Sequence, residues 1–235
     1  MFSIFRETDQ LSTVEQQLVE MLASCQDTFR LATAALFGEQ DVFEAGDQLD
    51  ETDKDLNRTE RAIRRELLVH GTVRGAEVDQ GLMLAYMSVA KDIERIGDYC
   101  KNIWNLAQIG VSFAGADDLT ELTKHRMRVA SLIERAITAF ATQDAQTVHE
   151  LIPAIRDDLG HYDTHIIQYV TSDEPGRYSA PRALFYRYLK RISAHLSNTL
   201  SSVVMPVDRL DFYKPSKAVV EPEAEDAEDP LDHEF

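Results

Sequence analysis

Glycine, proline and cysteine are all scarce in this sequence. Its 235 residues include 10 glycines, 7 prolines and 2 cysteines. So few turn-forming residues favour long helices over a turn-rich all-β fold. Cys25 and Cys100 both fall at apolar helical positions, so we expect buried free thiols and no disulfide framework.

Long hydrophobic runs and basic residues are also few. The longest apolar run, about Leu82 to Ala90, is far shorter than the roughly 20 residues that a membrane span needs. The N-terminal MFSIFRETDQ lacks the pattern of a secretory signal, so we expect a cytoplasmic protein that does not insert into membranes. The formal net charge is −17. Nucleic acid and anionic lipid both attract basic surfaces, so a basic protein surface or cations suit this chain better.

Apolar residues recur every three or four positions along most of the chain. This spacing is typical of helices packed in a bundle. It predicts six helices, over about 14–36, 41–70, 86–107, 122–140, 148–170 and 185–203. A connector is expected over 110–118 and a loop over 172–181.

The sixth predicted helix repeats the third at a fixed offset. Besides the apolar seam, Arg95 aligns with Arg191 and Asn102 with Asn198. This pattern predicts an all-α fold of two tandem three-helix units that form an up-down helical bundle. The units are expected at residues 1–112 and 113–213. Residues 214–235 are acidic and nearly free of large apolar side chains, so they are expected to form a disordered tail.

Two helices carry polar oxygen ligands beside their apolar seams. Glu94 and Asp98 are four residues apart on the third helix, where like charges repel. Asp53, Asn57 and Glu60 lie on the flank of the second helix. If the two flanks face each other, four carboxylates and an amide come together, and oxygen-preferring cations would relieve their repulsion. These five residues are the candidate metal ligands, with Fe, Mn, Mg, Ca or Zn all admissible.

The same acids also have a simpler interpretation. Lys91 lies three residues before Glu94, and Lys101 lies three residues after Asp98. Most charged stripes at the edge of a helical seam are solvated and make only weak ion pairs. Spacing alone therefore leaves both the metal site and the ion pairs open.

Two segments resemble the PhoU-domain family. The run DIERIGDYCKNI closely resembles that family's third-helix motif, and LDETDKDLNRTERAI resembles its second-helix pattern, in which Asp, Asn and Glu recur on one face. The predicted pair of three-helix units, over about residues 10–210, is also similar to the family's architecture. The third-helix motif is the specific part of the resemblance.

The resemblance implies an all-α, non-enzymatic regulator of phosphate uptake and phosphate signalling. Such proteins act in the cytoplasm on inorganic-phosphate transporters, and in many bacteria they restrain a sensor kinase. Family members can bind metal clusters through an E/D-x-x-x-D motif, which Glu94 and Asp98 match. Implied partners are therefore a transporter component, for phosphate or another ion, and a sensor kinase. Self-association is also expected.

The chain departs from the family pattern at two places. Lys190 and Ala194 occupy the second-unit positions equivalent to Glu94 and Asp98, so we expect at most one metal cluster, in the first unit. The segment HGTVRGAEVDQGLMLAY replaces the Gln-Pro and Asp-Leu-Arg that usually precede the third helix. A relative that serves another phosphate or ion transporter is therefore an alternative.

Other chemistry has weaker support in the sequence. Asp158, His161 and His165 share one flank of the fifth helix, but a solvated surface is the expected role for these histidines because no third His follows. A helical-bundle metal-storage protein is the chief rival function. The sequence contains no Gly-rich phosphate loop, nucleophile elbow or CxxC pair to support an enzyme.

Overall fold

Six long helices and a short 3₁₀-helix make up the part of the chain that the structure describes. The structure is a computed structural model, and it describes residues 2–74 and 79–210. The helices are α1 (Phe2–Leu36), α2 (Val42–Arg74), α3 (Gln80–Gln108), α4 (Leu119–Ala141), α5 (Ala145–Val170), α6 (Gly176–Val204) and η2 (Val207–Arg209). These residues contain no strand, and the predicted all-α fold is confirmed. The predicted tail, 214–235, lies outside the described residues.

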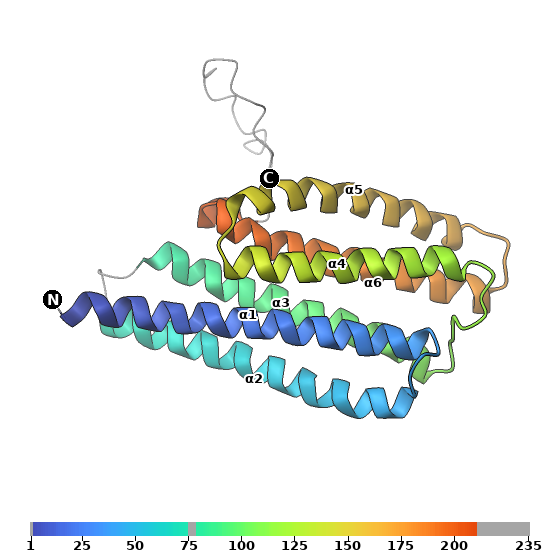
Figure 1. The fold of residues 1–235 in the computed structure, drawn as a ribbon, viewed down its shortest axis with the longest axis horizontal. Coiled ribbons are helices and arrows are strands. Elements are labelled where there is room, and N and C mark those ends of the chain that lie inside the picture. Colours follow the sequence, from blue (N-terminus) through green and yellow to red (C-terminus); the bar gives the residue numbers. More distant parts are fainter. Residues whose placement is uncertain (1, 75–78, 211–235) are drawn as a thin grey trace, which may run out of the picture.

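The helices alternate in direction and form two groups of three (Figure 1). One group comprises α1, α2 and α3, and the other comprises α4, α5 and α6. Contacts between the groups run mainly from α3 to α6 and from α1 to α4. One hydrophobic core continues through both groups, so the two predicted units share buried surface. The exact unit boundary stays a prediction.

Three phenylalanines join the two groups at the connector end. Phe37 follows α1, Phe113 belongs to the connector and Phe185 lies on α6. Their rings meet edge to face, with centroids 5.4 to 5.9 Å apart. Edge-to-face pairs add stabilisation beyond burial alone. The end of the first unit, the connector and the second unit are therefore packed together.

A buried polar network also crosses from α3 to α6. His195 Nδ1 lies 2.7 Å from Asp92 Oδ1, and the Asn198 amide donates to the same oxygen at 3.3 Å. Arg191 Nε donates to the hydroxyl of Tyr99 at 3.1 Å, and the Tyr99 ring stacks on His195. Buried polar groups need specific partners, so this network fixes the register of the two helices.

Several predicted helix boundaries are wrong, since α1 begins at Phe2 instead of near residue 14 and α3 begins at Gln80 instead of near residue 86. Helix α2 continues through Gly71 to Arg74, and the missing side chain of Gly71 leaves room for Met83 of α3. The predicted loop 172–181 ends early, because α6 begins at Gly176. Proline usually interrupts a helix. Pro181 nevertheless lies inside α6, whose first turns are held in place by the hydrogen bond from Arg182 to Asp118.

The predicted burial of the two free cysteines is confirmed. Cys25 and Cys100 are free and fully buried. Trp104 is 6% exposed, and its indole nitrogen donates to the Val42 carbonyl at 2.8 Å. None of the helices in the described ranges is long and apolar enough to span a bilayer.

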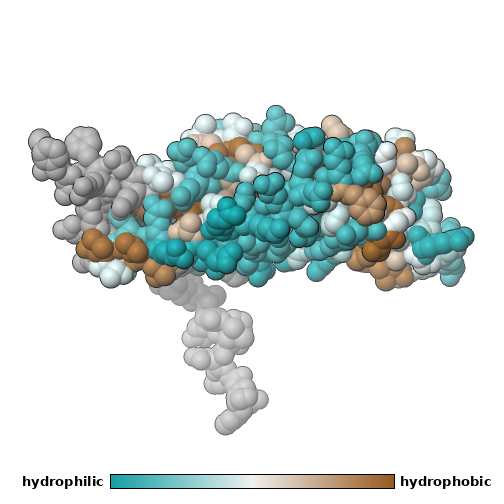
Figure 2. All heavy atoms as spheres, turned by 90° about the horizontal axis from the view of Figure 1, so that it is seen from below, coloured by the Kyte–Doolittle hydropathy of each residue, from teal (hydrophilic) through white to brown (hydrophobic). Residues whose placement is uncertain are grey.

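The molecular surface is largely hydrophilic on the side seen from below the view of Figure 1. Figure 2 shows hydrophobic side chains near both ends of this face. At the end where α2 finishes and α3 begins, Leu68, Val73 and Leu84 are each more than half exposed. Most of the surface between the two ends carries polar side chains.

Candidate metal-binding face between α2 and α3

The flanks of α2 and α3 approach closely because α3 carries a glycine where the helices meet. A Cβ atom at Gly97 would lie 2.6 Å from Leu56 Cδ1 of α2 and 3.9 Å from Cys25 Sγ of α1. Real side chains do not tolerate the shorter of these distances. Gly97 therefore allows the backbones to pack, and this places the acids of the two helices near each other.

The five predicted ligands lie at the α2–α3 contact but differ in burial. Glu60 and Glu94 are buried, at 5% and 7% exposure. Asp53 and Asn57 are half-buried, and Asp98 is the most exposed of the five. Carboxylates are rarely buried unless they are paired, so Glu60 and Glu94 require positive partners.

Lys91 and Arg64 supply those partners. The Lys91 ammonium lies 2.6 Å from Glu94 Oε2 and 3.9 Å from Glu60 Oε1, and so links α3 to α2. Arg64 Nη2 lies 2.8 Å from the same Glu60 oxygen, although without hydrogen-bond geometry. The expected pairing of Lys91 with Glu94 is therefore present.

Lys101 pairs with α2 instead of with Asp98. Its ammonium lies 2.8 Å from Asp50 Oδ1 and 3.5 Å from Asp53 Oδ2. Asp50 was not among the predicted ligands, although it lies one turn before Asp53 on the same flank. The Asn57 amide donates to the Asp53 carbonyl at 2.9 Å.

Asp98 has less favourable surroundings than the other acids. Partial burial raises its pKa, and the negative charges of Glu94 and Asp53 raise it further. Lys91 and Arg95 oppose this increase, but more weakly. An added cation near Asp98 would favour its ionised form. The electrostatics at Asp98 therefore suit a cation.

The ligand atoms of this face suit a hard cation in chemistry, but they lie too far apart to share one ion as they stand. Carboxylate and amide oxygens are the ligands that Mg²⁺, Ca²⁺ and Mn²⁺ prefer. Within the described ranges, no three of these carboxylates bring oxygens within 4.8 Å of one another. An ion that bound Glu94 would also have to displace Lys91 from it. Binding here would need side-chain rearrangement.

The equivalent face of the second unit is paired internally. Lys190, at the position equivalent to Glu94, places its ammonium 2.5 and 2.6 Å from the two carboxylate oxygens of Asp163 on α5. Ala194, equivalent to Asp98, offers no ligand. A fixed ammonium group thus lies where a metal ligand would be needed.

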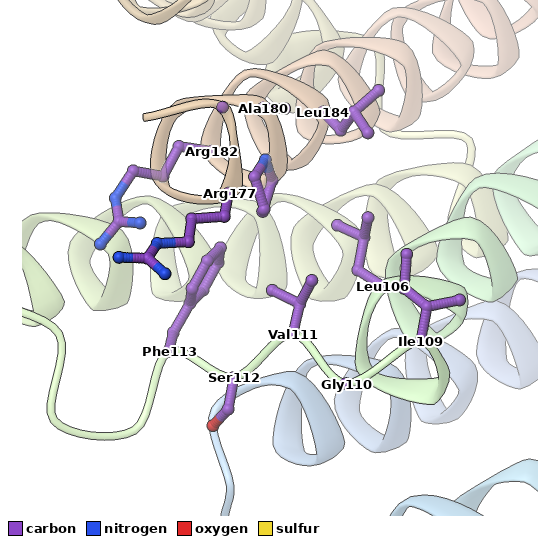
Figure 3. A pocket seen from close by; sticks show the side chains of 12 residues that line it. Leu106, Ile109, Gly110, Val111, Ser112, Phe113, Arg177, Ala180, Arg182 and Leu184 are labelled. Atoms are coloured by element: carbon purple, nitrogen blue, oxygen red, sulfur yellow. The ribbon is translucent and has the colours of Figure 1, made fainter. Parts of the chain in front are cut away.

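A hollow beside the connector has different chemistry. It has a volume of about 490 Å³ and lies between residues 106–113 and the start of α6. Figure 3 shows Phe113, Val111 and Leu106 extending into it, with Arg177 and Arg182 together at one edge. Arg182 is bound by both oxygens of Asp118, so much of its charge is already neutralised. This hollow contains no metal ligands among its lining residues.

A compact group of metal-ligand side chains occurs elsewhere, between α4 and α5. It consists of Glu121, His125 and His165. The sequence signal was present in part, because Glu121 and His125 are four residues apart. The third member comes from the next helix, and only the folded structure shows that it is close.

The fold and the acidic α2–α3 face define a class of protein. It is an all-α protein of two three-helix groups, with carboxylates along the contact between two helices of the first group. Residues 18–107 match the family model described as "PhoU domain". Residues 18–107 are therefore similar to the PhoU domain, the family that the third-helix motif resembles.

Two known proteins are similar over most of the chain. The "Phosphate-specific transport system accessory protein PhoU homolog" of Synechocystis sp. is 25% identical over 200 residues, which cover 82% of this chain and 87% of that protein. The crystal structure of PhoU from Pseudomonas aeruginosa superposes with a TM-score of 0.71 at 24% identity. It covers 84% of this chain and 96% of the other, and this likeness is one of fold.

Proposed function

We propose that this protein is an accessory regulator of phosphate transport and phosphate signalling that acts by binding. The observation that carries the proposal is the 200-residue similarity to an accessory protein of phosphate-specific transport. The PhoU domain over residues 18–107 supports it. Its partners would be a transporter component or a sensor kinase in the cytoplasm, and no catalytic step is involved.

The physical basis of regulation would be a difference in affinity for two states of the partner. A ligand can shift a conformational equilibrium only by as much as it prefers one state. The net charge of −17 favours a basic partner surface and speeds encounter with it. Rigid helices, joined by the α3–α6 network, would present one fixed docking surface.

We also propose that the α2–α3 face binds cations, with Glu94, Asp98, Asp53, Asn57 and Glu60 as ligands. The raised pKa of Asp98, caused by partial burial and by Glu94 and Asp53, supports this proposal. Lys91 would have to release Glu94, so binding would depend on ion concentration. An ion here would neutralise negative charge on the face and change its affinity for a partner.

Phosphate uptake in the source organism tests the regulatory proposal. Deletion of the gene should raise phosphate uptake, or the activity of phosphate-starvation genes, when phosphate is abundant. Expression of the wild-type chain from a plasmid should restore the low level. Affinity-tagged protein should also co-purify with a phosphate-transport component or a sensor kinase.

The contrary result is clear. Unchanged uptake after deletion, together with no transport or kinase component recovered under either phosphate-rich or phosphate-poor growth, would refute the proposal. Recovery of a transporter for a different ion would instead support the alternative that this chain regulates another transporter.

A metal-storage bundle is the second candidate, and the acidic α2–α3 face is the observation that favours it. Elemental analysis of the purified chain separates the two functions. Storage predicts several iron atoms per chain and oxidation of added Fe²⁺. Regulation predicts a few ions at most, with no turnover of Fe²⁺.

A further inference from the structure

A compact cluster of imidazole and carboxylate groups lies in the second unit, away from the acidic α2–α3 face. Glu121 and His125 are on α4, and His165 is on α5. One ligand atom from each lies within 4.8 Å of the other two. The cluster borders a cavity of about 620 Å³ that opens to solvent.

We propose that Glu121, His125 and His165 form a binding site for one divalent transition-metal ion, with Zn²⁺ as the best match. Two neutral imidazoles and a carboxylate are a ligand set that zinc and its neighbours use in proteins. Hard cations such as Mg²⁺ and Ca²⁺ prefer sites built from oxygen alone. The proposed site therefore differs in chemistry from the α2–α3 face and does not rest on the proposed function.

The three ligand atoms need to move only a short way to share one ion. Zinc bonds of about 2.0–2.2 Å would hold tetrahedral ligand atoms about 3.3 Å apart. His125 Nε2 and Glu121 Oε1 are already 2.9 Å apart, in a hydrogen bond that an ion would replace. The Glu121 side chain is 45% exposed, so it is free to rotate toward an ion.

Aromatic rings hold both imidazoles in place. Tyr186 stacks on His165 with ring centroids 4.3 Å apart and an angle of 9°. Its edge also meets His125, at 5.2 Å. Tyr186 is fully buried, and its hydroxyl has no hydrogen-bond partner among the described residues. Ligands that are fixed before binding lose little conformational entropy when the ion arrives.

The protonation state of the two histidines also favours metal binding. Burial lowers the pKa of His125 and of His165, which favours the neutral form of each ring. The neutral ring offers a lone pair to a metal. Arg128 is already paired with Asp158 at 2.8 Å, whereas Lys124 lies 3.4 Å from Glu121 and an ion would have to displace it, which its 71% exposed side chain permits.

The cavity provides room for a fourth ligand. Zinc sites with three protein ligands commonly complete their tetrahedron with water. His161 and Asp158 line the same cavity, but Asp158 is bound to Arg128 and His161 is exposed. Water is therefore the fourth ligand in this proposal. The ion would cross-link α4 to α5, a pair of helices that otherwise make few contacts.

Zinc binding by the purified full-length chain tests the proposal. After treatment with a chelator, the wild type should bind one Zn²⁺ per chain in calorimetry and give a visible Co²⁺ absorption band typical of tetrahedral coordination. His125→Gln/His165→Gln should weaken zinc binding by about 100-fold and abolish the Co²⁺ band, because two of three ligands are lost. Glutamine preserves side-chain size, and circular dichroism without metal checks the fold.

Two control variants locate the site. His161→Gln changes a histidine in the same cavity that is not a proposed ligand, so it should alter zinc affinity by less than about 3-fold. Glu94→Ala/Asp98→Ala changes the α2–α3 face and should leave the zinc stoichiometry of the α4–α5 site intact. Failure of the wild type to bind zinc, or equal binding by the His125→Gln/His165→Gln variant, would overturn the proposal.

Discussion

Asp118 holds together the three helices of the second unit at one end. It precedes α4, accepts two hydrogen bonds from Arg182 of α6 at 2.6 and 2.7 Å, and accepts one from Tyr169 of α5 at 2.9 Å. Arg182 is 7% exposed and also lies 3.6 Å from the ring centroid of Tyr178. Loss of the charge on Asp118 would leave a buried guanidinium without its main partner.

Asp118→Asn should therefore destabilise the protein in a pH-dependent way. At pH 7 we expect a loss of about 1.5–3 kcal/mol, the usual scale for hydrogen bonds to a charged group. Burial tends to raise the pKa of Asp118, but the bonds from Arg182 and Tyr169 outweigh burial and lower it. A lowered folded-state pKa gives stability that is complete above the ordinary aspartate value and is lost as pH falls through the folded value.

Denaturant unfolding between pH 7 and pH 3 measures this effect. The difference between wild type and Asp118→Asn should shrink as the pH falls. The matched control is Asp117→Asn, because Asp117 is 77% exposed and lies 3.7 Å from the same arginine. It should cost less than about 1 kcal/mol. A gap between wild type and Asp118→Asn that stays constant with pH would contradict this account.

At the scale of helices, the contact between α2 and α3 depends on a missing side chain. Gly97→Ala would place a methyl group against Leu56, which is itself 4% exposed and has little room to move. Overpacking a core typically costs about 1–3 kcal/mol. The better helix propensity of alanine recovers up to about 1 kcal/mol, so we expect a net loss of stability.

Gly160→Ala provides the opposite expectation on α5. No atom lies within 4 Å of a Cβ at Gly160, and the residue is exposed. Alanine there should stabilise the fold by about 0.5–1 kcal/mol through helix propensity alone. Thermal unfolding measures the change in stability of both variants. A stabilising Gly97→Ala would show that α2 and α3 do not pack as described.

The helices themselves could be predicted from sequence because each buries one apolar stripe. Val89, Ile93 and Ile96, which follow the three- and four-residue spacing of the third predicted helix, are all at most 1% exposed. Helix ends were less predictable, because they depend on tertiary partners. Arg182 reaches Asp118 across 64 residues of sequence, and this contact anchors the first turns of α6 that the sequence assigned to a loop.

The candidate site could be predicted only in part, for a similar reason. Helical spacing placed Glu94 and Asp98 on one flank, but it could not choose between a metal and a lysine as their partner. Lys101 was expected near Asp98 but pairs with Asp50 and Asp53 on another helix. His165 was assigned to solvent because its partner, His125, lies 40 positions earlier in the chain. Periodicity describes single helices and does not show which helices meet.

At the scale of the whole molecule, the two groups of helices should unfold as one body. They share a continuous core, and Asp92 links them through His195 and Asn198. We expect one cooperative transition for the wild type by circular dichroism and by tryptophan fluorescence from Trp104. Coincidence of the two signals is informative, because Trp104 lies in the first group only.

Asp92→Ala should lower the midpoint of that transition and keep it single. The change leaves His195 and Asn198 without their buried acceptor, which costs about 1–3 kcal/mol. Asp47→Ala, an exposed site on α2, should change the midpoint little. Two separate transitions in the wild type would mean that the α3–α6 contact does not couple the groups.

The interlocked phenylalanines at the connector have a consequence for how this architecture can be divided. Although the helical pattern repeats, Phe37, Phe113 and Phe185 make each copy complete the other at their junction. A gene divided at that junction would yield two fragments, each with phenylalanine side chains newly exposed to water. We therefore expect that neither group of helices folds as a separable piece of this polypeptide.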